Sequence, residues 1–154
     1  MTITAGQNTA RVSYAVAQGV TQTSFSVPFE FFSDGDLKVY VDGTLKTITT
    51  HYTVSGGNGS TGTVTLSVTG ATGGSTVIII RDIPLQRTTD FPSSGAFDIG
   101  ALNTELDTII AIASDVDTAA TRSLRLSDTD TTTSLTIPDT NTRKGTVLGF
   151  NAST

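Results

Sequence analysis

Short runs of alternating apolar and polar residues, separated by turn-forming residues, dominate the first half of the chain. Val12, Tyr14 and Val16 alternate with polar or small neighbours, and residues 37–41 and 64–68 repeat the pattern. A period of two places alternate side chains on one face of an extended strand. The pattern therefore predicts half-buried β-strands for this half of the chain.

Glycine and proline mark where these strands end. Asp42-Gly43 is the strongest short hairpin signal, and the glycine-rich stretches Ser55 to Gly62 and Gly70 to Gly74 separate later strands. Pro28 lacks an N–H, so the strand that reaches it should end there or lie at a sheet edge. We expect six or so short strands in an antiparallel β-sandwich or small barrel.

One apolar run departs from the alternation. Residues Val77 to Ile80 are apolar without interruption. A continuous short run is typical of a strand that is covered on both faces. We therefore expect this strand to be buried on both sides.

Composition supports a β-rich chain and bounds its partners. Only 36% of the residues are hydrophobic, the net charge is −5, and there is no cysteine. An acidic chain has no excess cation to neutralise phosphates, so we expect no nucleic-acid binding. Without disulfides, stability beyond one core must come from packing or from other subunits, which makes oligomerisation a natural expectation.

The N-terminus and the hydrophobicity profile indicate no membrane association. Residues Met1 to Ala10 are polar and lack the charged-then-apolar layout of a secretory signal, and no run approaches the ~20 apolar residues of a membrane span. We expect a soluble protein that is made in a cytoplasm.

A helix is predicted after an aperiodic connector over Leu85 to Ala96. Asp98 is a candidate N-cap, and apolar residues recur at heptad-like spacing from there to about Ala120. The apolar stripe is broader than the seam of a dimeric coiled coil, so one face can pack on the sheet while another meets symmetry mates. We expect the interface with symmetry mates to involve Leu102, Leu106, Ile109, Ile112 and Val116, with purely intrachain packing as the alternative.

These patterns divide the chain into three parts. Residues 1–97 form a β-rich domain with its connector, residues 98–121 form the helix, and residues 122–154 form an extended linker. The last part is Thr-rich and has too few apolar residues for a core of its own.

The densest aromatic cluster has two readings. As core, these rings would fill the inner face of the sheet; as an interface, they would anchor a docking partner. The cluster consists of Phe25, Phe29, Phe31 and Phe32.

Candidate chemical motifs favour structural roles. His51 is the only histidine, so one chain holds no His-containing triad or multi-histidine metal site. The glycine-rich loop lacks the lysine of a phosphate loop, because Thr63 follows Gly62. Asp128-Thr129-Asp130 has the opening spacing of a calcium loop but not its glycine or distant glutamate. We expect no catalytic, cofactor-binding or metal-binding residue and no enzymatic activity.

Several separate phrases resemble those of one protein family and keep their order along the chain. They are Val27-Pro28-Phe29-Glu30-Phe31, Leu37-Lys38-Val39-Tyr40-Val41-Asp42-Gly43, Arg81-Asp82-Ile83-Pro84-Leu85-Gln86, Thr89-Asp90-Phe91 followed by Gly95-Ala96-Phe97, and Leu102-Asn103-Thr104-Glu105-Leu106-Asp107. Together they are similar to the N-terminal domain of bacteriophage tail fibres and tailspikes of the T-seven group and its relatives, over roughly Ser13 to Ala120.

The resemblance implies a virion structural protein rather than an enzyme. It implies a homotrimer whose β domains dock into the collar, nozzle or baseplate of the phage tail, with the helix leading toward a distal part that meets the host. Such a protein would be assembled in the bacterial host cytoplasm and carried on the virion. An alternative is a β domain that itself binds a host-surface glycan.

One departure from the family leaves two readings open. In fuller members the helix continues into a shaft or receptor-binding domain, whereas this chain stops at Thr154. The chain is then either a truncated fibre or a complete short adaptor on which a separate receptor-binding protein docks.

Overall fold

The computed structural model describes residues 10–86, 98–124 and 144–145. Its contacts divide the chain into two units, Met1–Arg122 and Ser123–Thr154. The first holds every strand and helix given below. In the second, the described residues form only a bend at Ser123 and a turn at Lys144-Gly145, so the predicted linker over 122–154 lies mostly outside the described residues.

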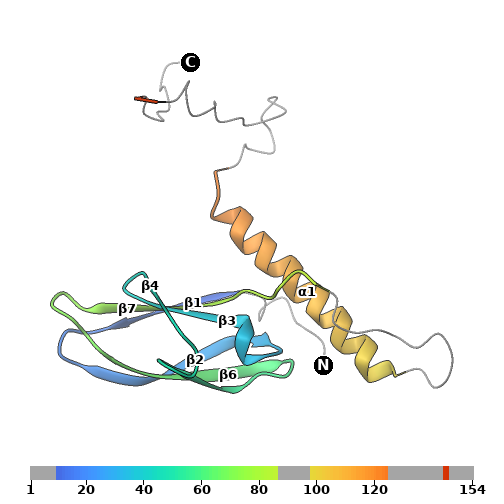
Figure 1. The fold of residues 1–154 in the computed structure, drawn as a ribbon, viewed down its shortest axis with the longest axis horizontal. Helices are drawn as coiled ribbons and strands as arrows, with labels where there is room; N and C mark the ends of the chain where they lie inside the picture. The colour runs from blue at the N-terminus through green and yellow to red at the C-terminus, as the bar shows by residue number, and fades with distance from the viewer. Residues whose placement is uncertain (1–9, 87–97, 125–143, 146–154) are drawn as a thin grey trace. The chain divides into compact units, whose positions relative to one another are not determined.

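The first unit is mainly β, with two antiparallel sheets and one helix (Figure 1). One sheet has the order β1-β7-β3-β4 and the other the order β2-β6-β5. The strands are β1 (Arg11–Val16), β2 (Thr21–Phe31), β3 (Leu37–Val41), β4 (Thr44–Lys46), β5 (Thr53–Gly56), β6 (Ser60–Thr69) and β7 (Ser75–Arg81). A short 3-10 helix, η2 (Asp34–Asp36), joins β2 to β3, and α1 spans Ile99–Thr121.

One hydrophobic core lies between the two sheets. It takes alternate residues from both, because a pleated strand sends every second side chain inward. The buried members are Val16, Phe25, Val27, Phe29, Phe31, Leu37, Val39, Tyr52, Val64, Leu66, Val68, Val77 and Ile79. The prediction of a mainly β chain with an antiparallel two-sheet architecture and one helix is confirmed.

The turns follow the local sequence signals. Asp42 and Gly43 both have positive φ, 49° and 77°, as a two-residue hairpin between β3 and β4 requires. The Asp42 carboxylate accepts a hydrogen bond from the Thr76 amide at 2.7 Å, which ties this hairpin to β7. That bond, with a further one from Ser75, lowers the pKa of Asp42.

The structure confirms one expectation for the strands and corrects another. At Pro28 the edge alternative holds: β2 continues from Thr21 through Pro28 to Phe31, and it is an edge strand. The run Val77 to Ile80 is not buried on both faces. Val77 and Ile79 are fully buried, but Ile78 and Ile80 lie on the outer face and are only half-buried.

The glycine-rich hairpin between β5 and β6 is shaped by an aromatic ring. Phe31 is fully buried, and a Cβ built on Gly57 or Gly62 would lie 2.5 Å or 2.7 Å from its ring. The Gly59 amide also donates to the Phe31 carbonyl at 3.0 Å. The glycines therefore let the backbone pack directly on the Phe31 ring. This packing explains why the stretch is rich in glycine, and no phosphate-binding role is needed to explain it.

This close packing makes Gly62→Ala destabilising. The new methyl group would lie 2.3 Å from the Ser55 carbonyl oxygen as well as against Phe31. We expect a loss of about 1–3 kcal/mol in the free energy of unfolding, the usual cost of overpacking, measured by denaturant titration. Gly35→Ala is the control, because its Cβ would meet only the Ser33 hydroxyl at 3.8 Å. Equal effects of the two variants would contradict this packing.

Candidate functional site

Arg81, the last residue of β7, ties the sandwich to α1. Its guanidinium is fully buried and donates to the Asp115 carboxylate at 2.8 Å, to the Glu30 carbonyl at 2.7 Å and to the Ala111 carbonyl at 3.1 Å. It also lies over the Phe29 ring, with 5.9 Å between the Arg81 Cζ atom and the ring centroid. A single side chain thus joins both sheets to the helix, and we call these contacts the Arg81 clamp.

Asp115 completes the clamp from the helix side. One carboxylate oxygen accepts from Arg81, and the other accepts from the Ile83 amide at 3.4 Å. Burial raises the pKa of Asp115, and the Arg81 charge and the two hydrogen bonds only partly oppose that effect. For this carboxylate, desolvation is therefore the largest single influence on the pKa.

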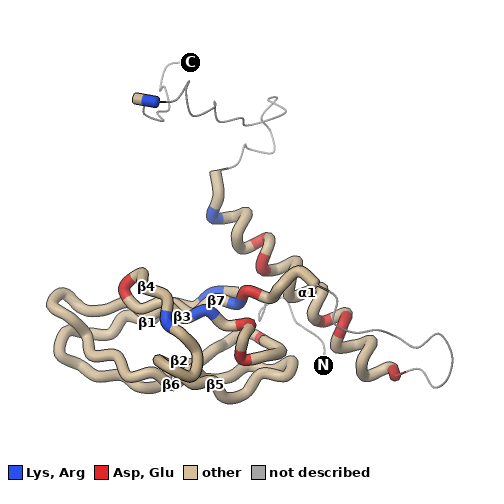
Figure 2. Tube along the Cα trace, viewed as in Figure 1, with Lys and Arg blue, Asp and Glu red and all other residues tan. Residues whose placement is uncertain are grey.

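Local sequence explains why α1 begins and ends where it does. The Asp98 carboxylate accepts from the Ala101 amide at 3.1 Å, so the predicted N-cap is confirmed. At the other end the Arg122 amide donates to the Ala119 and Ala120 carbonyls. Figure 2 shows acidic positions along α1 and the basic Arg122 at its C-cap, where a cation complements the helix dipole.

The helix turns a polar, small face toward the sandwich. Ala111 is fully buried, which lets the helix backbone approach Arg81. Thr108, Asp115 and Thr118 lie on the same side and are partly buried. Their spacing of three or four residues is that of one helix face.

The apolar face of α1 points the other way. Each of Leu106, Ile109 and Val116 lies two residues before a member of the buried face, which is roughly 200° around a helix of 3.6 residues per turn. Their exposed fractions are 50%, 52% and 62%. Ile99 and Ile110 are also exposed. The described part of the chain therefore leaves a stripe of aliphatic side chains uncovered.

The residues expected at the trimer interface divide into two groups. Leu106, Ile109 and Val116 lie in the exposed stripe, whereas Leu102 and Ile112 are half-buried. Leu102 shares the face of Leu106 and Ile109, since it precedes them by four and seven residues. Whether other chains cover this stripe stays a prediction.

The aromatic cluster is mostly core. Phe25, Phe29 and Phe31 are 0–1% exposed, and Phe32 is half-buried. Tyr14 adds an edge-on contact to Phe25, with ring centroids 5.5 Å apart. Three of the four rings expected as core or docking residues are therefore inaccessible to a partner.

Sequence reasoning missed the Arg81 clamp. Two features of the sequence could have indicated it. Arg81 is a basic residue at an inward position at the end of an apolar strand, and Asp115 lies among the small residues of one helix face. Spacing could not link them, because Arg81 and Asp115 are 34 residues apart. Glu30 was also missed as a buried group: it is 3% exposed, and its Oε2 atom has no hydrogen-bond partner.

Two acidic residues of the described chain lie in separate structural settings. Glu30 is buried beside the clamp and Asp98 caps the helix, while Asp90 and Asp128 to Asp130 lie outside the described residues. His51 is exposed, and its Nδ1 atom accepts from the Thr47 amide at 3.1 Å, which stabilises a turn. Over the described ranges, no group of three or more potential metal ligands occurs.

No described helix combines the length and apolar content that crossing a bilayer requires.

Comparison with known proteins leaves the family unassigned. A scan against protein-family models finds no match, and a search of curated proteins finds no significant relative.

The clamp predicts a graded response at Asp115. We expect Asp115→Ala to cost about 3 kcal/mol in the free energy of unfolding, because it leaves the buried Arg81 charge unpaired. Asp115→Asn should cost less, since its amide oxygen can still accept from Arg81. Denaturant titration and hydrogen exchange of α1 amides would measure both effects.

Asp117→Ala is the matched control, because Asp117 is exposed on the same helix. It should change stability by less than about 0.5 kcal/mol, as is usual for surface positions. If Asp115→Ala behaved like this control, the clamp would not hold the helix.

Proposed function

We propose that this chain is a trimeric structural attachment module of a bacteriophage tail fibre or tailspike. Its sandwich docks on the virion tail, and α1 associates with α1 of two further copies. The module thereby carries host-facing parts of the fibre, or a separate receptor-binding protein, and supports adsorption. It is assembled in the bacterial cytoplasm and acts on the virion.

The exposed stripe on α1 is the observation that carries the proposal. A helix normally buries its apolar face against its own core. Here the polar face is held by the Arg81 clamp, and Leu106, Ile109 and Val116 are left at least half exposed. A stripe of this kind marks an association surface, and its width favours more than two helices.

The sequence resemblance adds the virion context. Its phrases fall at structurally demanding places: residues 27–31 in the buried half of β2, residues 37–43 in β3 and its hairpin, and residues 81–86 at the clamp. Substitutions in these three phrases would disturb the core, the hairpin or the Arg81 clamp, so the fold itself constrains them. It supports tail-fibre anchoring over a free-standing glycan-binding domain.

Association can be tested by light scattering during size-exclusion chromatography. We expect a mass of three times the 16.0 kDa chain. Ile109→Asp should yield monomers at the same concentration, because each chain would lose about 2 kcal/mol of apolar burial and bring a charge into the contact. A wild-type chain that stays monomeric at high concentration would contradict the proposal.

Asn103→Asp is the control for added charge. Asn103 is an exposed polar residue at the flank of the stripe, so this variant should keep the trimer. Near-ultraviolet circular dichroism of both variants should retain the wild-type tyrosine signal, which shows that the sandwich is intact. For the virion role, antibodies against the sandwich should label the tail in electron micrographs of purified particles; unlabelled particles would contradict it.

A further inference from the structure

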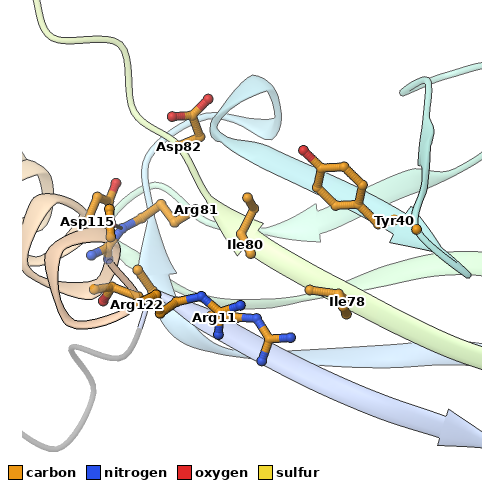
Figure 3. Close-up of a pocket in the computed structure, with 12 residues that line it drawn as sticks. Arg11, Tyr40, Ile78, Ile80, Arg81, Asp82, Asp115 and Arg122 are labelled. Carbon is orange, nitrogen blue, oxygen red and sulfur yellow. Dashed lines mark hydrogen bonds and ion pairs between the residues drawn. The ribbon is translucent and has the colours of Figure 1, made fainter. Parts of the chain in front are cut away.

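The outer face of the four-stranded sheet and the C-terminal half of α1 enclose a cleft. Its volume is about 410 Å³, within the range of ligand pockets. Figure 3 shows side chains from β1, β3, β7 and α1 converging on it. We call it the basic cleft, and its defining residues are Arg11, Tyr40, Ile78, Ile80, Thr118 and Arg122.

The floor of the basic cleft is apolar. Ile78 and Ile80 project from the outer face of β7, and Tyr40 lies beside them on β3, where its partner in register is Ile78. All three are half-buried. Isoleucines on the outer face of a sheet are unusual beside solvent, and their partial exposure leaves apolar area that a ligand side chain can cover.

Two cations in the basic cleft are left over after its acids are paired. Asp82 pairs with Lys38, and Asp115 pairs with Arg81. Arg11 and Arg122 also line the cleft, and neither has an ion pair with a described residue. Figure 3 shows both side chains extending along it. The cleft is therefore a locally positive site on a chain whose net charge is −5.

We propose that the basic cleft binds an acidic peptide segment that also carries apolar side chains. Its carboxylates would pair with Arg11 and Arg122, since guanidinium groups bind carboxylates through two parallel hydrogen bonds. A neighbouring aliphatic or aromatic side chain would cover Ile78, Ile80 and Tyr40. The assignment of this segment to a tail protein of the virion rests on the proposed function. The acidic and apolar character of the segment is inferred from the cleft residues alone.

Other occupants fit the basic cleft less well. Two arginines on an acidic chain are too few for a nucleic-acid backbone, whose binding depends on neutralising several phosphates. A further copy of α1 would meet the stripe, which lies on the opposite side of the helix from Asp115 and Thr118. Association through the stripe therefore leaves the basic cleft open for a different partner.

Two capped pentapeptides test the proposal: Glu-Leu-Glu-Phe-Glu and its uncharged counterpart Gln-Leu-Gln-Phe-Gln. In NMR titrations of the full chain, we expect the acidic peptide to shift amide signals of β1, β7 and the last turns of α1. The uncharged peptide should bind at least tenfold more weakly, and raising the salt concentration should remove most of the difference.

Charge-matched variants locate the site. Arg11→Gln combined with Arg122→Gln should weaken binding of the acidic peptide at least tenfold. Lys46→Glu changes the net charge by the same two units at a residue that does not line the cleft, and it should leave binding within twofold. Equal affinity for the two peptides, equal effects of the double variant and Lys46→Glu, or signal shifts outside the cleft would each overturn the proposal.

The outcome separates this inference from the proposed function. A chain that forms trimers and labels the tail but binds neither peptide would refute the basic cleft as a docking site alone. A chain that binds the acidic peptide as expected but stays monomeric and is absent from particles would refute the proposed function alone.

Discussion

The Arg81 clamp fixes which side of α1 is available for assembly. A fully buried guanidinium needs hydrogen-bond partners on every side, and it finds them in the Asp115 carboxylate and in the Glu30 and Ala111 carbonyls. These partners come from the end of β2 and from the small, polar face of the helix. Because that face is held against the sandwich, the aliphatic face must point outward. The buried charge thus acts less as a source of stability than as a device that sets orientation, a role best attested for polar groups in helical interfaces.

The same junction separates two surfaces of different chemistry. On one side of α1, Leu106, Ile109 and Val116 form an apolar stripe suited to identical copies. On the other, the helix and the outer sheet face form the basic cleft, which Arg11 and Arg122 line together with Ile78 and Ile80. The proposed attachment module would need one surface for copies of itself and another for the particle. Placing them on opposite sides of one helix lets both be occupied together.

Much of the fold was predictable because its signals are local. Alternation predicted β1, β3 and β6, Asp42-Gly43 predicted the hairpin, and Asp98 predicted the start of α1. Interactions between distant residues limited the rest. The run Val77 to Ile80 indicated burial on both faces, yet its outer isoleucines line a cleft, because the helix covers only one end of that sheet face. The glycine-rich stretch marked a break between strands, but only the structure shows that its glycines accommodate the Phe31 ring.

The amino-acid sequence by itself determined the strands, the turns, the helix and the presence of a wide aliphatic stripe, since each depends on residues a few positions apart. Only the tertiary structure decided which face of α1 meets the sandwich. That choice depends on Arg81 and Asp115, which lie 34 residues apart and become partners only when β7 and α1 pack together. Periodicity shows that a helix has an apolar face. Which face packs on the sandwich depends on where the buried charge finds its counterion.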